Sequence, residues 1–335
     1  MQRPRVVRFW RRRFLLAGCW LLVTPLQAPA QQAGKVWRIG FLTTRSRPEA
    51  LERDFLSAWV PKLRELGYVD GKNLAIEWRF AGGDNDRLPA LAAELVRQSP
   101  DLIITAGTPA ALAAQKATAS IPIVIAGVAD PVGFGLVASL SRPGANITGA
   151  SIMATDVSVK SLEFLRAFVP ELSRVAVLLN PTNPIDPAAL KQIRIAAEPR
   201  SVGVAAFEAS TADQIDTAFA AIARSRVEAL IVAPDPLLVN QARQIVDAVT
   251  RLRLLAIYPF RPFVEVGGLM CYGQDIYANF RVAATFVDRI FKGARPGELP
   301  VEQPTQLVLV VNRSAADAIG VKLPSSILAR ADEVL

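Results

Sequence analysis

Residues 102–126 read LIITAGTPAALAAQKATASIPIVIA, and this stretch decides the fold class. The apolar, β-branched run at 102–105 predicts a buried strand, and the G-T-P that follows it is typical of the first turn of a helix. We expect that helix at 109–117 and the next strand at 121–126. A strand, a helix and a strand in this order make a βαβ unit, so the sequence predicts a parallel sheet in an α/β fold.

The same alternation extends in both directions from this unit. We expect further strands at 37–42, 73–80, 147–151, 174–179, 204–209, 229–232, 254–258, 267–272 and 306–311, and long helices at 49–66, 157–168, 237–252 and 276–292. The pattern falls into two series, because LIITA followed by a proline is echoed by LIVAP at an offset of roughly 130 residues. The chain is therefore predicted to form two doubly wound parallel-sheet lobes with a cleft between them.

The tail of the chain is expected to cross between these lobes again. We predict a first lobe of residues 36–150 plus 266–298 and a second lobe of residues 151–265 plus 299–335. Several connections then form a hinge, and a ligand would close the lobes by hinge motion.

Residues 1–30 have the pattern of an export signal peptide. Six arginines precede an apolar run from Phe14 to Val23, and the small residues Ala28 and Ala30 mark a cleavage site before Gln31. The R-R-R-F-L sequence within this leader fits the motif for export by the twin-arginine route, and the leader is equally consistent with an ordinary secretory signal. Acylation of Cys19 as a lipoprotein is disfavoured, because the apolar run continues beyond it. The chain is predicted to be periplasmic.

The composition of the remaining chain argues against several classes of function. Six of the 38 basic residues lie in the leader, which leaves a net charge of only about +2 and no basic stripe for nucleic acid. The chain has no histidine, and Cys271 is the single cysteine after cleavage. Histidine-based catalysis and the common transition-metal sites are therefore improbable, so we expect no cofactor, no metal and no enzymatic activity.

Several motifs resemble a known protein family. They are LGYVDGKNLAIEWRFAGGDNDRLPALAAELV (66–96), AGTPAALAA (106–114), DPVGFGLVASLSRPGANITG (130–149) and GGLMCYG (267–273). The chain is similar to the solute-binding proteins of ABC importers, in the subfamily that includes tryptophan- and tyrosine-type binders. This resemblance implies a type I periplasmic-binding-protein fold, two lobes joined by a multi-strand hinge, and a small-molecule ligand in the interlobe cleft.

Candidate ligand contacts follow from a rule for open parallel sheets, in which ligands lie beyond the carboxyl ends of the strands and near helix N-termini. The Gly107–Thr108 turn is suited to an anion, a carboxylate to an ammonium group, and a tyrosine to an apolar group. Each of these residues could instead serve the fold alone, a carboxylate as a helix cap or a partner in a loop ion pair, and the Gly107–Thr108 turn as a helix cap without ligand. The rule selects Thr43, Thr44, Gly107, Thr108, Asp130, Pro131, Asn180, Asp235, Tyr258, Tyr272 and Asp275.

The sequence therefore supports a monomeric, exported solute-binding component of an ABC importer, whose partners are ABC permease subunits in the membrane and whose ligand is an amino acid or related carboxylate. A periplasmic sensory module that docks onto a receptor is the alternative, because it would use the same lobes. An enzyme on this fold is a third and weaker hypothesis, since no carboxylate pair at catalytic spacing is visible.

Overall fold

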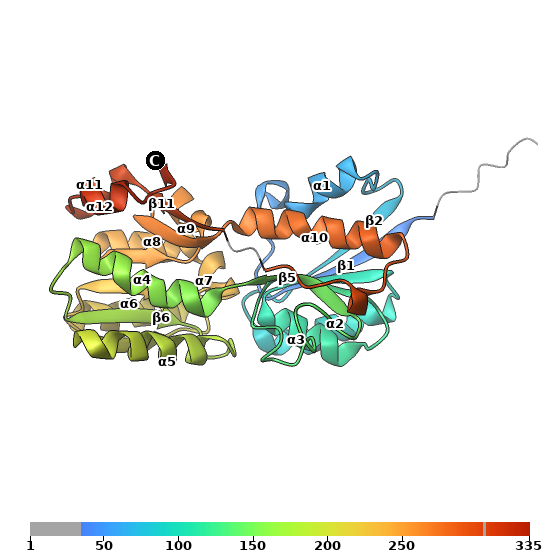
Figure 1. The fold of residues 1–335 in the computed structure, drawn as a ribbon, viewed down its shortest axis with the longest axis horizontal. Coiled ribbons are helices and arrows are strands. Elements are labelled where there is room, and N and C mark those ends of the chain that lie inside the picture. Colours follow the sequence, from blue (N-terminus) through green and yellow to red (C-terminus); the bar gives the residue numbers. More distant parts are fainter. Residues whose placement is uncertain (1–34, 304–305) are drawn as a thin grey trace, which may run out of the picture. The chain divides into compact units, whose positions relative to one another are not determined.

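Two sheets, each covered by helices, organise the chain in the computed structural model (Figure 1). The structure describes residues 35–303 and 306–335, and residues 36–335 form one unit. The predicted export signal and Cys19 lie outside the described residues. Within the described part of the chain, every helix is too short or too polar to cross a membrane.

The first lobe is built on a five-stranded sheet with the order β2-β1-β3-β4-β5, and all its strand pairs are parallel. Its strands are β1 (Trp37–Thr43), β2 (Leu74–Phe80), β3 (Leu102–Ala106), β4 (Ile123–Ala129) and β5 (Ile147–Ile152). Its helices are α1 (Trp59–Glu65), α2 (Leu88–Arg97) and α3 (Thr108–Ala117), with 3₁₀ turns at Leu51–Arg53, Phe55–Ser57 and Asn85–Arg87. β3 is buried at every position, as expected for a central strand with helices on both faces.

The second lobe is built on a seven-stranded sheet with the order β12-β11-β10-β9-β8-β6-β7. Its strands are β6 (Arg174–Leu179), β7 (Gly203–Glu208), β8 (Ala229–Val232), β9 (Leu255–Tyr258), β10 (Met270–Gln274), β11 (Leu307–Val311) and β12 (Glu333–Val334). Its helices are α4 (Ala154–Phe168), α5 (Asp186–Ala197), α6 (Ala212–Arg224), α7 (Pro236–Asn240), α8 (Ala242–Arg251), α9 (Arg261–Glu265), α11 (Arg313–Ile319) and α12 (Ser325–Leu328), with a 3₁₀ turn at Glu198–Arg200. Only the pairing of β10 with β11 is antiparallel among the strand pairs of this sheet in the described residues.

The two sheets repeat one topology. The order β2-β1-β3-β4-β5 in the first lobe matches β7-β6-β8-β9-β10 in the second, and β11 and β12 extend the second sheet. The internal repeat and the fold class predicted from the sequence, two doubly wound α/β lobes of the type I periplasmic-binding-protein kind, are therefore confirmed.

Each lobe is completed by a helix that crosses over from the other half of the chain. The helix α4 follows β5 and packs in the second lobe, and α10 (Ile276–Phe291) follows β10 and packs on α1, β4 and β5 of the first lobe (Figure 1). Where these crossings run side by side, the backbone N–H of Met153 donates to Oε1 of Gln274 at 2.9 Å. Inside the first lobe, Asn279 of α10 accepts from the N–H of Gly127 at 2.8 Å and donates to the carbonyl of Ser151 at 3.1 Å.

The predicted lobe boundaries need two corrections. Residues 266–275 do not belong to the first lobe, because β10 pairs with β9 and β11 in the second sheet. Residues 299–302 do not belong to the second lobe, since Leu299 accepts from the Thr148 hydroxyl at 2.8 Å and Glu302 donates to Gly149 at 2.9 Å. A short 3₁₀ turn at Pro296–Glu298 precedes this last crossing.

Two predicted helices are broken. The segment 49–66 becomes two 3₁₀ turns and α1, because the Asp54 side chain accepts from the N–H of Leu56 and Pro61 is tolerated only in the first turn of a new helix. The segment 237–252 splits into α7 and α8 at Gln241, whose φ of −101° and ψ of 23° are not helical.

Candidate functional site

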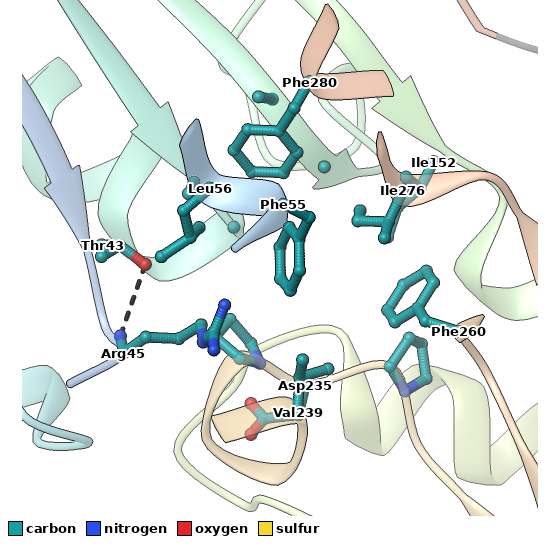
Figure 2. Close-up of a pocket in the computed structure, with 16 residues that line it drawn as sticks. Thr43, Arg45, Phe55, Leu56, Ile152, Asp235, Val239, Phe260, Ile276 and Phe280 are labelled. Atoms are coloured by element: carbon teal, nitrogen blue, oxygen red, sulfur yellow. Dashed lines mark hydrogen bonds between the residues drawn. The ribbon is translucent and has the colours of Figure 1, made fainter. Parts of the chain in front are cut away.

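The cleft lies where the switch points of the two sheets face each other. In each sheet the strand order reverses beside the first strand of the series, between β1 and β3 and between β6 and β8. A doubly wound sheet leaves a crevice there, beyond the carboxyl ends of its strands. Residues at or beyond the ends of β1, β3 and β8 line one cavity together with residues from other elements of both lobes, and we name this cavity the chamber (Figure 2).

The chamber is mainly apolar. Figure 2 shows the rings of Phe55, Phe260 and Phe280 around one space, with Ile152 and Ile276 beside them. The complete lining is Thr43, Arg45, Phe55, Leu56, Ala106, Gly107, Ala126, Gly127, Ile152, Pro234, Asp235, Pro236, Val239, Phe260, Ile276 and Phe280. About 40 Å³ is open to the centres of water molecules, which is room for a few waters. A solute of amino-acid size therefore enters only when the lobes part or side chains of the lining move.

Arg45 brings a buried cation to the chamber wall. It is 7% exposed, and its Nη1 and Nη2 donate to the two carboxylate oxygens of Asp54 at 2.8 and 3.0 Å. Its guanidinium carbon lies 4.6 Å from the centroid of the Phe55 ring, and Phe55 meets Phe280 edge to face at 5.4 Å. The 3₁₀ turn that follows Asp54 thus holds an arginine and an aromatic ring together at the edge of the chamber.

Asp235 is the acidic residue of the chamber wall. It follows β8 and caps α7, where Oδ1 accepts from the N–H of Leu238 at 3.0 Å. Its Oδ2 accepts from the side-chain amides of Asn180 at 3.2 Å and Asn183 at 3.0 Å. Burial raises the pKa of Asp235, although these hydrogen bonds oppose the rise. Burial and the nearby Asp235 charge likewise raise the pKa of Asp186.

The two lobes touch at the N-terminal corner of α7. Gly107 has φ of +89° and ψ of 158°, and a Cβ at this position would lie 2.8 Å from Cγ of Pro236. A Cβ on Gly83, whose φ is +91°, would lie 3.1 Å from Cδ1 of Leu237. Glycines of the first lobe therefore form the seat against which the second lobe packs.

Five of the eleven residues predicted from the sequence lie at or directly behind the chamber. Thr43, Gly107 and Asp235 line it. Thr44 is fully buried and donates to Asn85, and Asn180 donates to Asp235.

The structure places the other predicted residues outside the chamber lining, where other contacts hold them. The Thr108 hydroxyl accepts from the N–H of Ala129, the exposed Asp130 caps Gly133, and the carbonyl of Pro131 accepts from Leu136. Tyr258 stacks on Phe263 at 4.9 Å, and burial raises the pKa of its hydroxyl, which has no hydrogen-bond partner in the described chain. Tyr272 packs against Phe164 at 4.6 Å, and Asp275 caps α10 and pairs with Arg281.

The sequence reasoning missed most of the chamber. Phe55 comes from a 3₁₀ turn and Phe280 from a crossover helix, and neither follows a strand, whereas Phe260 and Ile276 lie two residues beyond β9 and β10. Arg45 had a usable signal, because it lies two residues beyond β1. The lining offers no metal site, and residues 35–303 and 306–335 contain no group of three or more acidic or cysteine side chains placed to hold one.

The sequence of this chain matches a family model, that of ABC transporter substrate binding proteins, over residues 58–335. The chain belongs to this family. The tyrosine-binding protein of Clostridioides difficile (strain R20291) is 26% identical over 262 residues, which cover 78% of this chain and 75% of that protein.

Solved structures of similar sequence show the same fold. A conserved domain protein from Vibrio cholerae is 26% identical with a TM-score of 0.82, covering 90% of this chain and 100% of that one. An ABC domain in complex with L-Trp from Streptococcus pneumonia is 25% identical with a TM-score of 0.79, and the match covers 89% of this chain and 99% of that one. A ligand-free, open substrate-binding protein with adhesive properties from Clostridium difficile is 26% identical with a TM-score of 0.61, covering 89% and 99%.

Two of these structures match this chain to different degrees. The identities to the L-Trp complex and to the open protein are almost equal, yet the TM-scores are 0.79 and 0.61. Lobes that rotate about a hinge as rigid bodies lower a global score without changing the fold of either lobe. The overall structure of this chain is thus more similar to that of the L-Trp complex than to that of the open protein.

Proposed function

We propose that this substrate-binding protein captures an amino acid or related carboxylate with an apolar or aromatic side chain, and delivers it to the permease of an ABC importer outside the cytoplasm. The observation that carries the proposal is the apolar chamber enclosed between the switch points of both lobes. Small-molecule sites are typically such cavities, with a few polar groups that fix the orientation of the ligand.

The chamber offers a place for each part of such a ligand. The rings of Phe55, Phe260 and Phe280 suit an apolar side chain, whose burial contributes about 2–3 kcal/mol. Gly107 is the N-cap of α3, and the free N–H groups of the first turn of this helix, with the nearby Arg45 cation, suit a carboxylate. Asp235 suits an ammonium group, which would supply the positive charge that its buried carboxylate requires.

Calorimetric titration of residues 31–335 with L-phenylalanine, L-tyrosine and L-tryptophan tests the ligand class. We expect binding of one molecule per chain, and glucose and ribose serve as polar probes that should not bind. The variant Val239→Trp fills the chamber and should abolish binding, whereas Ile195→Trp on the exposed face of α5 should leave it unchanged. Binding of a sugar in place of the amino acids, or equal binding by Val239→Trp, would contradict the proposal.

The importer role rests on the family and on the predicted export signal. A binding component without chemistry of its own needs a membrane permease to complete transport. Uptake of the radiolabelled amino acid that binds best should therefore be lost when the coding sequence is deleted and regained when it is restored. Uptake that is unaffected by the deletion would remove the importer role while leaving the ligand class intact.

A further inference from the structure

A continuous series of side-chain hydrogen bonds crosses from the first lobe to the second beside the chamber. The Thr44 hydroxyl donates to Oδ1 of Asn85 at 2.7 Å, and Nδ2 of Asn85 donates to the Thr182 hydroxyl at 3.0 Å. The Thr182 hydroxyl donates to Oδ1 of Asn180 at 2.8 Å, and Nδ2 of Asn180 donates to Oδ2 of Asp235 at 3.2 Å. We name these five residues the relay.

Every bond of the relay runs in the same direction. Thr44 donates to Asn85, each of the next three side chains accepts from the residue before it and donates to the one after it, and the series ends on a carboxylate, which is a strong acceptor. Hydrogen bonds arranged in this way polarise one another, so breaking one bond weakens its neighbours.

The relay has one joint between the lobes. Thr44 and Asn85 lie in the first lobe, Thr182, Asn180 and Asp235 lie in the second, and the contact of Asn85 with Thr182 joins them. Because the other bonds lie within one lobe, each half of the relay is arranged before the lobes meet. When the lobes close, the bond between Asn85 and Thr182 therefore forms without a further entropic cost of ordering these two side chains.

One end of the relay lines the chamber and the other lies directly behind it. Thr43, the neighbour of Thr44, lines the chamber on the side of the first lobe, and Asp235 lines it on the side of the second. The carbonyl of Thr44 also accepts from the N–H of Gly83 at 2.6 Å, and Gly83 is part of the seat for α7. The joint therefore forms at the same corner where the lobes come into contact.

We propose that Asn85 and Thr182 are positioning residues that latch the closed form of this protein, and so set ligand affinity without touching the ligand. This proposal depends on the proposed function in one respect, which is that closure of the two lobes serves to capture the ligand. Asn85 does not follow from the ligand-site rule, because it lies in a 3₁₀ turn, and Thr182 lies in the loop after β6 that the rule marks through Asn180.

The distance between the lobes tests the latch directly. Spin labels on cysteines that replace the exposed Lys116 of α3 and Lys191 of α5 report the open and closed populations by pulsed electron resonance. The native Cys271 is buried and should stay unlabelled. The populations are measured without ligand and during titration with L-tryptophan.

The variants separate a latch from a structural role. Asn85→Ala removes both bonds of its Nδ2 to Thr182, at 3.0 Å to the hydroxyl and 3.4 Å to the carbonyl, whereas Thr182→Val removes only the bond to the hydroxyl. Each variant should lower the ratio of closed to open protein about two- to tenfold, as expected for the loss of exposed hydrogen bonds. The double variant should lower the ratio no further than Asn85→Ala alone, and Thr182→Ser should keep the wild-type ratio, because the hydroxyl is kept. Thr217→Val on the exposed face of α6 is the matched control and should change nothing.

Additive effects of the two substitutions, or a loss equal in Thr182→Ser and Thr182→Val, would overturn the latch. A ratio unchanged in both single variants would overturn it as well. If L-tryptophan and the other aromatic amino acids fail to close the wild-type protein, the proposed ligand class fails, and the latch is still judged from the ligand-free populations.

Discussion

Replacing Gly107 by alanine should weaken ligand binding by two separable effects. The backbone of Gly107, with φ of +89° and ψ of 158°, occupies a region that only glycine adopts readily, and an L residue there costs about 1–3 kcal/mol. This strain acts in the open and in the closed form, so it lowers the free energy of unfolding. The new Cβ adds a contact of 2.8 Å with Cγ of Pro236, which exists only when the lobes are closed.

The contact determines the size of the effect on binding. It is several tenths of an ångström shorter than ordinary van der Waals contact, so the corner of α7 must move outward for the lobes to close. Overpacking of this kind costs about 1–3 kcal/mol, which corresponds to a loss of affinity of about 5- to 150-fold. Gly107→Ala should therefore bind its amino acid more weakly by this factor, in addition to being less stable.

Urea unfolding and calorimetric titration measure the two effects separately. Gly135→Ala is the matched control, because its φ of +66° strains an alanine while a Cβ there has no atom within 4 Å. The control should lose stability and keep its affinity, and Pro236→Ala combined with Gly107→Ala should regain affinity. A folded Gly107→Ala protein that binds as tightly as the wild type would refute the seating of α7 on this glycine in the ligand-bound form.

Three further predictions follow from buried groups. Asn279→Ala removes the partners of two backbone groups and should lower the free energy of unfolding in urea by about 2–4 kcal/mol, whereas Thr285→Ala on the same helix should lower it by less than about 1 kcal/mol. Equal effects would show that the hydrogen bonds of Asn279 to Gly127 and Ser151 do not stabilise the first lobe. Burial raises the pKa of Asp186, so the folded protein keeps a proton that the unfolded chain loses near pH 4. The free energy of unfolding of the wild type should therefore fall relative to that of Asp186→Asn as the pH rises from about 4 toward 7. A difference between the two proteins that does not change with pH would show that this pKa is not raised. Burial raises the pKa of the Cys271 thiol to about 12. A disulfide reagent should therefore react with Cys271 in native residues 31–335 at least about a hundredfold more slowly than in the urea-unfolded chain, and equal rates would contradict the burial of this thiol.

Local sequence signals predicted most elements of the fold. The aliphatic runs of β3 and β8 and the glycine and proline residues after them were sufficient to place strands, helices and the repeat of the two lobes. The sheet to which β10 belongs was not predictable in this way, since its residues Met270–Gln274 have no local feature that selects one lobe. Its place is set by pairing with β9 and with β11, which is distant in the sequence.

The candidate site was predictable only where it follows the sheet. Thr43, Gly107 and Asp235 come after the central strands, and the rule for doubly wound sheets finds such positions. Phe55 and Phe280 read as ordinary core residues in the sequence, and they reach the chamber because a 3₁₀ turn and a crossover helix bring them there. Tertiary packing therefore determines the apolar half of the chamber.

A crystal structure of residues 31–335 grown with L-tryptophan tests the central claim most directly. The account predicts one ligand molecule in the chamber, with its ring against Phe55 and Phe280, its ammonium group at Asp235, and the joint of Asn85 with Thr182 formed. An empty chamber in a crystal whose protein binds L-tryptophan elsewhere would contradict it.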